Sequence, residues 1–132
     1  MSGILIVEDE RIIAEDIRMT IKEFGYHVIG IADNAEQAYE LFEKNAPDLI
    51  LMDIKIKGEM SGIKLAKKIM SKRKTAIIFL TSFADDKIWR EIHSIENSGY
   101  LLKPFSCSKL KEIIEEAIRG NSVTEDFKMV LN

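Results

Sequence analysis

The chain contains little cysteine and little proline, and these shortages exclude several classes of protein. Its 132 residues include one cysteine, Cys107, and two prolines. A single cysteine cannot form an internal disulfide framework or a multi-cysteine zinc site, which suits a reducing compartment. No apolar run approaches the roughly 18 residues that span a bilayer, and the N-terminus has no signal-peptide pattern. We therefore expect a cytoplasmic protein that does not insert into a membrane.

The chain also has fewer positively charged than negatively charged residues. The chain has 19 lysines and arginines against 22 aspartates and glutamates, a formal net charge of −3 at pH 7. A nucleic-acid surface needs a basic patch to contact phosphates, so this balance argues against direct nucleic-acid binding. The length predicts one domain. We expect it to cover residues 2–120, with 121–132 as a C-terminal tail or the start of a linker.

Predicted strands and helices alternate along the chain. Short apolar runs without interruption are typical of strands that are buried on both faces. The five predicted strands cover 4–7, 27–32, 48–52, 76–80 and 99–102. Apolar residues at helical spacing predict a helix after each strand, and Asn34 with Gln37 forms a capping-box pattern before the second helix. The sequence therefore predicts an α/β fold, a doubly wound five-stranded parallel sheet with helices on both faces.

Polar side chains follow four of the five predicted strands. They are Glu8 and Asp9, Asp53, Thr81 with Ser82, and Lys103. In an open parallel sheet, ligands bind beyond the carboxyl ends of the strands. Oxygen ligands suit Mg²⁺, and a lysine supplies the compact positive charge that a phosphate needs. Alone, each residue is equally well a helix-dipole partner, a turn residue or a helix cap, but together they indicate a functional site.

The order and spacing of these motifs resemble the receiver domain of two-component response regulators. The resemblance covers residues 2–119 and rests on four motifs: ILIVED ending at Asp9, DLILMD ending at Asp53, IIFLTS around Thr81 and YLLKPF around Lys103. It implies a flavodoxin-like fold with strand order 2-1-3-4-5. It also implies two-component phosphorelay signalling, in which Asp53 accepts a phosphoryl group from a histidine kinase or a phosphotransfer protein. No enzyme activity is implied beyond Mg²⁺-dependent self-phosphorylation from small donors and autodephosphorylation.

The resemblance further implies a metal site. Mg²⁺ would be bound by Asp9, Asp53 and the backbone carbonyl of Lys55, with Glu8 acting through water. The loop after Asp53 departs from the family, because residues 54–62 lack the usual proline and contain one extra residue. Lys55 and Phe83 occupy positions thought to tune hydrolysis, and we expect them to restrict the attacking water and lengthen the phosphorylated lifetime.

The same resemblance implies a switch. Thr81 would contact the phosphoryl oxygens, and Lys103 would bridge to the acyl phosphate beside a cis bond to Pro104. Tyr100 would turn inward and remodel the face formed by the fourth helix, fifth strand and fifth helix. This face would bind a downstream protein partner, and phosphorylation could also link two copies into a homodimer. By residue type alone, Tyr100 and Trp89 are equally well packing aromatics, and a partly exposed Trp89 would suit a partner anchor.

Other functions fit the sequence less well. A flavodoxin-like FMN carrier needs a glycine- and hydroxyl-rich loop after the first strand, where this chain has Glu8, Asp9 and Glu10. An aspartyl phosphatase would have a second aspartate where this chain has Lys55. Within the receiver interpretation, the chain is either a stand-alone regulator or the N-terminal receiver of a longer sensor or hybrid histidine kinase. Residues 124–131 resemble a helix that leads into a PAS domain.

Overall fold

The computed structural model describes residues 3–82 and 85–119. Within these ranges five strands alternate with five helices. The strands are β1 (Gly3–Val7), β2 (His27–Ala32), β3 (Leu49–Asp53), β4 (Ala76–Thr81) and β5 (Ser98–Leu102). The helices are α1 (Arg11–Glu23), α2 (Ala35–Asn45), α3 (Gly62–Lys72), α4 (Asp86–Ser94) and α5 (Cys107–Ile118). Each predicted strand is present, and its bounds differ from the prediction by at most one residue at either end.

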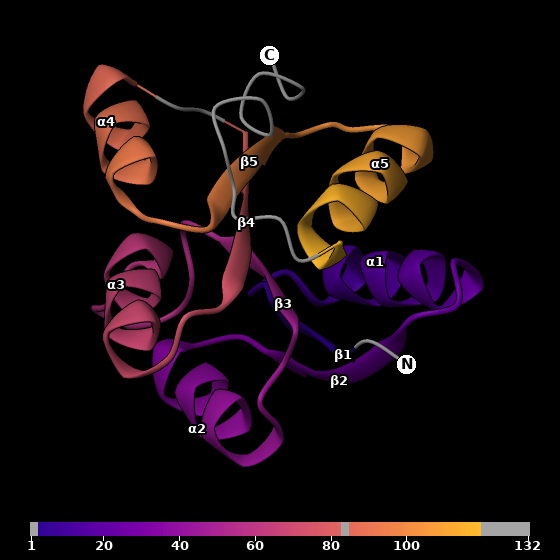
Figure 1. The fold of residues 1–132 in the computed structure, drawn as a ribbon, viewed down its shortest axis with the longest axis horizontal. Coiled ribbons are helices and arrows are strands. Elements are labelled where there is room, and N and C mark those ends of the chain that lie inside the picture. Colours follow the sequence, from indigo (N-terminus) through magenta and orange to yellow (C-terminus); the bar gives the residue numbers. More distant parts are fainter. Residues whose placement is uncertain (1–2, 83–84, 120–132) are drawn as a thin grey trace.

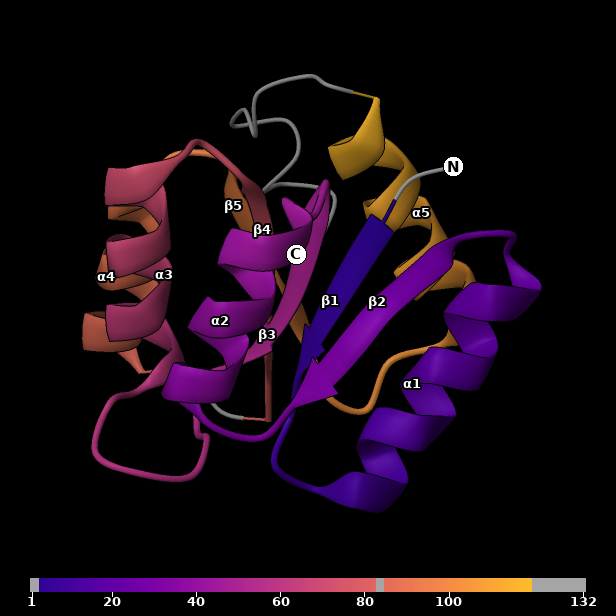
Figure 2. The same ribbon diagram turned by 90° about the horizontal axis from the view of Figure 1, so that it is seen from below.

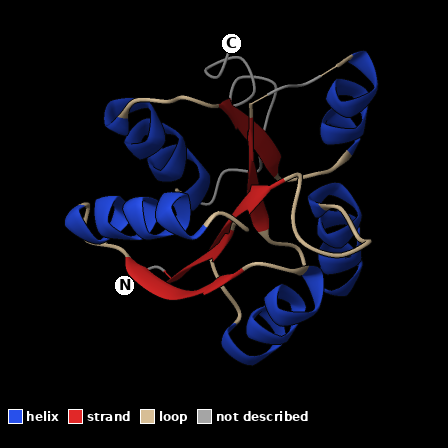
Figure 3. Cartoon of the chain, turned by 180° about the vertical axis from the view of Figure 1, so that it is seen from behind, coloured by secondary structure: helices blue, strands red, loops and turns tan. Residues whose placement is uncertain are grey.

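The strands form one parallel sheet in the order β2-β1-β3-β4-β5. This confirms the predicted fold and strand order. Helices α1 and α5 cover one face of the sheet, and α2, α3 and α4 cover the other (Figures 1 and 3). Figure 2 shows β2 at one edge, with β1 beside it and pointing the same way. Since all five strands are parallel, their carboxyl ends lie along a single edge.

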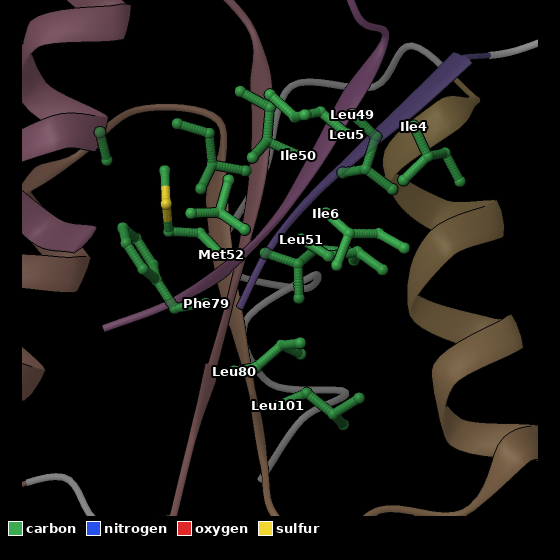
Figure 4. Close-up of a cluster of buried hydrophobic side chains, with 14 of the residues drawn as sticks. Ile4, Leu5, Ile6, Leu49, Ile50, Leu51, Met52, Phe79, Leu80 and Leu101 are labelled. Carbon is green, nitrogen blue, oxygen red and sulfur yellow. The ribbon is translucent and has the colours of Figure 1, made fainter. Parts of the chain in front are cut away.

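The core consists of apolar side chains on both faces of the central strands. All five residues of β1 and all five of β3 are buried. Successive side chains in a strand point to opposite faces. Ile4 and Ile6 accordingly point toward the layer that contains α5, whereas Met52 and Phe79 point to the opposite layer (Figure 4). Burial on both faces explains why these strands are continuous apolar runs rather than alternating ones.

Polar residues set the starts of the helices. Asn34 Oδ1 accepts a hydrogen bond from the Gln37 N–H at 2.9 Å, and Gln37 Oε1 accepts one from the Asp33 N–H at 3.3 Å, which confirms the predicted capping box. Asp85, rather than Thr81, caps α4 by accepting a hydrogen bond from the Ile88 N–H at 2.8 Å. Thr81 is therefore not a helix cap.

Some predictions fall on residues that the structure does not describe. Phe83 and the tail at 121–132, including the segment that resembles a PAS-linked helix, lie outside the described residues. Among the helices that are described, none has the length and apolar content needed to cross a membrane.

Candidate functional site

At the carboxyl edge of the sheet, one ammonium lies between two carboxylates. Lys103, directly after β5, donates hydrogen bonds from Nζ to Glu8 Oε2 at 3.0 Å and to Asp53 Oδ2 at 3.1 Å. The Glu8 side chain is fully buried, and those of Asp53 and Lys103 are 12% and 18% exposed. Charges held this far from water interact more strongly than a surface ion pair, and removal of one partner is costly.

Both oxygens of the Asp53 carboxylate have a partner. Oδ2 accepts the hydrogen bond from Lys103, and Oδ1 accepts one from the Lys55 N–H at 3.2 Å. The second bond, to the residue two positions ahead, is the Asx-turn pattern expected of an aspartate at the end of a strand. Asp53 therefore has a fixed orientation at the edge of the sheet, and part of its side chain remains accessible to solvent.

Three consecutive carboxylates lie beside this ion pair. Ligand oxygens of Glu8, Asp9 and Glu10 are within 4.8 Å of one another. Glu8 is buried, Asp9 half-buried and Glu10 exposed, so the cluster runs from the core to the surface. Its like charges repel unless a cation or a proton compensates them. An all-oxygen donor set with several accessible carboxylates fits Mg²⁺, which takes one or two protein carboxylates and retains water.

The environment shifts the pKa of two groups at this edge. Burial raises the pKa of the Glu8 carboxyl from its ordinary value of 4.5 to about 7, with Asp53 adding to the rise and Lys103 opposing it. For Lys103, burial lowers the pKa, but the hydrogen bonds and charges of Glu8 and Asp53 outweigh burial and leave the pKa raised. Lys103 is therefore a permanent cation at neutral pH, whereas Glu8 can take up or release a proton there.

Thr81 lies at this edge, whereas Tyr100 lies deeper in the sheet. Thr81 ends β4 and is buried, and its backbone oxygen accepts a hydrogen bond from the Lys103 N–H at 2.8 Å. The bond from Lys103 to Pro104 is cis, as the resemblance implied. Tyr100 is two residues before Leu102, the register partner of Thr81, so it lies deeper in β5 and away from the edge. Tyr100 is 1% exposed and its ring contacts Trp89 of α4, so this side chain is already turned inward in the unphosphorylated chain.

The loop after Asp53 is held by contacts that the sequence did not indicate. The Lys57 N–H donates to the Asp33 oxygen at 3.0 Å, and Lys57 Nζ lies 3.3 Å from Asp33 Oδ2. The Gly62 N–H donates to the Ile54 oxygen at 2.8 Å, and a Cβ at Gly62 would collide with the backbone oxygen of Asp53. These contacts give the loop a definite conformation although it lacks the family's usual proline.

A mostly apolar cleft opens beside Lys103. It has a volume of about 440 Å³ and lies between α1, the β5–α5 connection and α5. Its walls include Ile17, Phe105 and Leu110, and Ser82 and Lys103 also line it. On α1, Ile12 is 86% exposed. An exposed isoleucine on a helix that borders an apolar cleft is typical of a surface that binds another protein.

The comparisons with known proteins agree with this geometry. A family model described as the response regulator receiver domain matches residues 4–115. The chain is 38% identical over 115 residues to the transcriptional regulatory protein PdtaR of Mycobacterium tuberculosis. This match covers 87% of the chain and 56% of PdtaR. The chain spans a little over half the length of PdtaR and of the transcriptional regulatory protein YdfI of Bacillus subtilis.

Two solved structures are similar in both sequence and fold. The signal receiver domain of a modulated diguanylate cyclase from Desulfovibrio desulfuricans G20 is 35% identical, with a TM-score of 0.82. The match covers 90% of this chain and 94% of that one. The N-terminal domain of a response regulator/sensory box/GGDEF three-domain protein from Carboxydothermus hydrogenoformans is 34% identical, with a TM-score of 0.80 and coverage of 89% and 94%.

Proposed function

The chain belongs to the response regulator receiver domain family, whose model matches most of its length, and we propose from this that Asp53 is its phosphoacceptor. The chain is a signalling domain of two-component systems rather than a conventional enzyme. The observation that carries the proposal is the pair of hydrogen bonds that hold Lys103 between Asp53 and Glu8. The test is Mg²⁺-dependent gain of one phosphoryl group from a small donor, which should be absent in Asp53→Asn.

The chemistry follows from the residues around Asp53. A carboxylate oxygen of Asp53 forms a bond to the phosphorus while the bond from phosphorus to the donor atom breaks, and the leaving group keeps the electron pair. Attack by an anion on an anionic phosphoryl group brings like charges together, so nearby cations are needed to stabilise the transition state. Lys103 supplies one such charge within hydrogen-bond distance of Asp53. Thr81 supplies a hydroxyl at the end of the adjacent strand.

The second positive charge is proposed to be Mg²⁺. Asp9, Asp53 and the backbone carbonyl of Lys55 would hold it, with Glu8 acting through water, and the bound ion would neutralise charge on the phosphoryl oxygens. The support for this is the packing of oxygen ligands around Glu8 and Asp9. Histidine kinases take their phosphoryl group from ATP in the cytoplasm, so we propose that the protein acts there.

The output of this chemistry is proposed to be a change of surface. Thr81 would follow the phosphoryl group, and the altered packing of Tyr100 would change the face formed by α4, β5 and α5. We propose that a downstream protein binds this face, or that two phosphorylated copies dimerise through it. The support is the position of Tyr100, which lies in β5 beneath α4 and shares the β4–β5 pair with Thr81.

The phosphodonor protein is proposed to dock on α1 beside the apolar cleft, since this surface adjoins Lys103. Ile12→Arg is expected to slow phosphoryl transfer from a histidine kinase by about tenfold or more, the effect typical of an apolar anchor at an interface. Phosphorylation from a small donor should be unchanged, because Ile12 is exposed and lies outside the ion pair. Transfer is measured by radiolabel with a kinase that phosphorylates the wild-type protein.

Ser71→Arg, which introduces the same residue at an exposed position of α3 in the opposite helix layer, is the matched control and should leave transfer at the wild-type rate. Equal rates for Ile12→Arg and wild type would place the kinase elsewhere. A parallel loss with the small donor would instead mean that the substitution damages the site itself.

A second candidate is a receiver at the N-terminus of a longer signalling protein, such as a sensor or hybrid histidine kinase with a following PAS domain. It is favoured by the similarity to the N-terminal domain of the three-domain protein from Carboxydothermus hydrogenoformans. The size of the natural product, measured by immunoblot with an antibody to this domain, separates the candidates. A band near 15 kDa supports a stand-alone regulator, and a much larger band supports the longer protein.

A further inference from the structure

The only tryptophan of the chain, Trp89, packs directly on Tyr100. The ring centroids are 3.9 Å apart and the planes meet at 83°, an edge-to-face arrangement. This separation is shorter than the usual range of about 4.5–7 Å for aromatic pairs, so the two rings are in tight contact. Trp89 also meets the ring of His93, with the centroids 5.0 Å apart. Trp89 thus covers Tyr100 on the side of α4.

Helix α4 buries only part of its surface. Of its residues, Ile92 alone is buried. Its C-terminal end is held by Ser98, whose hydroxyl donates to the backbone oxygens of Ile92 and Ile95 at 2.9 and 2.7 Å. Its middle is tied to α3 by a partly exposed ion pair between Lys67 and Glu91 at 3.5 Å, a contact worth little in water. Ile88 also packs against the core, and the contact between Trp89 and Tyr100 adds to what joins α4 to the sheet.

From this packing we infer that Trp89 is a positioning residue of the switch, which holds the Tyr100 ring in its buried position and couples the movement of that ring to α4. The inference deepens the proposed function and rests on it. Tyr100 cannot leave its position on the α4 side unless Trp89 moves, because the two rings are in contact. A change at Thr81 that alters the packing of Tyr100 must then also displace Trp89. The exposed α4 surface changes as a result.

The static part of the inference is tested by nitration of tyrosines with tetranitromethane, followed by peptide mass mapping. In the wild-type protein Tyr100 should be protected because its ring is buried. Trp89→Ala should raise its nitration rate about two- to tenfold, the population change expected when an aromatic pair is lost. Trp89→Phe should restore protection, since it keeps a ring at the same place.

Tyr39 on α2, which packs on Phe42 in a different part of the fold, is the internal control. Its nitration rate should be the same in all three proteins. Unchanged nitration of Tyr100 in Trp89→Ala would overturn the inference. A parallel rise at Tyr39 would also overturn it, because the substitution would then act through general stability.

The coupled part is tested by the emission of Trp89 itself. Phosphorylation with a small donor and Mg²⁺ is followed by intact mass and by tryptophan fluorescence in the same sample. A mass gain accompanied by a shift in emission, with neither in Asp53→Asn, is the expected result. A mass gain without any shift overturns this inference and leaves the proposed function in place. The absence of a mass gain overturns the proposed function, and this inference falls with it.

Discussion

Lys103→Met is expected to slow phosphorylation by a small donor about 10²–10³-fold, the cost of removing one charged group that stabilises a transition state. In the folded chain the ammonium donates a hydrogen bond to Asp53 Oδ2, an oxygen of the proposed phosphoacceptor. Methionine keeps an apolar stem of similar length and removes only the charge and its hydrogen bonds. The rate is measured by intact mass against time at saturating Mg²⁺.

The same substitution leaves two carboxylates, Glu8 and Asp53, without their shared cation. In EDTA at pH 8 we expect the free energy of unfolding to fall by about 3 kcal/mol, the cost of removing one member of a buried ion pair. The pKa of Glu8 is about 7 in the folded chain against 4.5 ordinarily, so the folded state takes up a proton between these values. Acid therefore favours the folded state over this window, and the loss should be smaller at pH 5.5 than at pH 8.

Lys109→Met on α5 is the matched control, because it makes the same lysine-to-methionine change at an exposed position on a helix surface. Neither its phosphorylation rate nor its stability should differ measurably from the wild type. If Lys103→Met were phosphorylated at the wild-type rate, the charge of Lys103 would have no part in the transfer.

Gly62→Ala is expected to lower the free energy of unfolding by about 2–4 kcal/mol, as forced overpacking against an immovable group does. The new Cβ would overlap the backbone oxygen of Asp53, and this atom belongs to the strand that carries the proposed phosphoacceptor. Relief of the overlap requires either the loop or the end of β3 to move. The phosphorylation rate should therefore fall together with the stability, as measured by urea unfolding and by intact mass.

Gly30→Ala in β2 provides the comparison. A Cβ at Gly30 would come within 3.3 Å of the end of the Leu41 side chain, which can rotate away. We expect a change of less than about 1 kcal/mol and an unaltered phosphorylation rate. Equal losses at Gly30 and Gly62 would contradict the close approach to Asp53 as the cause, and would indicate a general intolerance of larger residues at glycine positions.

The sequence predicted the sheet and the neighbours of Asp53 for one physical reason. Parallel strands share an edge at their carboxyl ends, so polar residues that follow apolar strands must come together once the strand order is known. Lys103 does lie within hydrogen-bond distance of both Glu8 and Asp53, although 95 residues separate Glu8 from Lys103. Continuous apolar runs predicted the strands themselves, because both faces of each central strand are buried.

Contacts formed by loops and by side chains between helices were not predictable in this way. The loop at 54–62 is fixed by Asp33 and Lys57, and no spacing rule pairs a residue after β2 with one after β3. The need for glycine at position 62 follows from that loop path. Likewise, residue type left Trp89 as either a packing aromatic or a partner anchor, and only the packing of α4 on β5 places it against Tyr100.

The most direct test of the account is the intact mass of the protein after incubation with a small phosphodonor, with and without Mg²⁺, beside Asp53→Asn. We expect the gain of one base-labile phosphoryl group in the wild-type protein with Mg²⁺, and no gain without the metal or in the variant. A wild-type protein that gains no phosphoryl group and binds no Mg²⁺ would contradict it. The fold would then serve as a docking module whose carboxylates have another purpose.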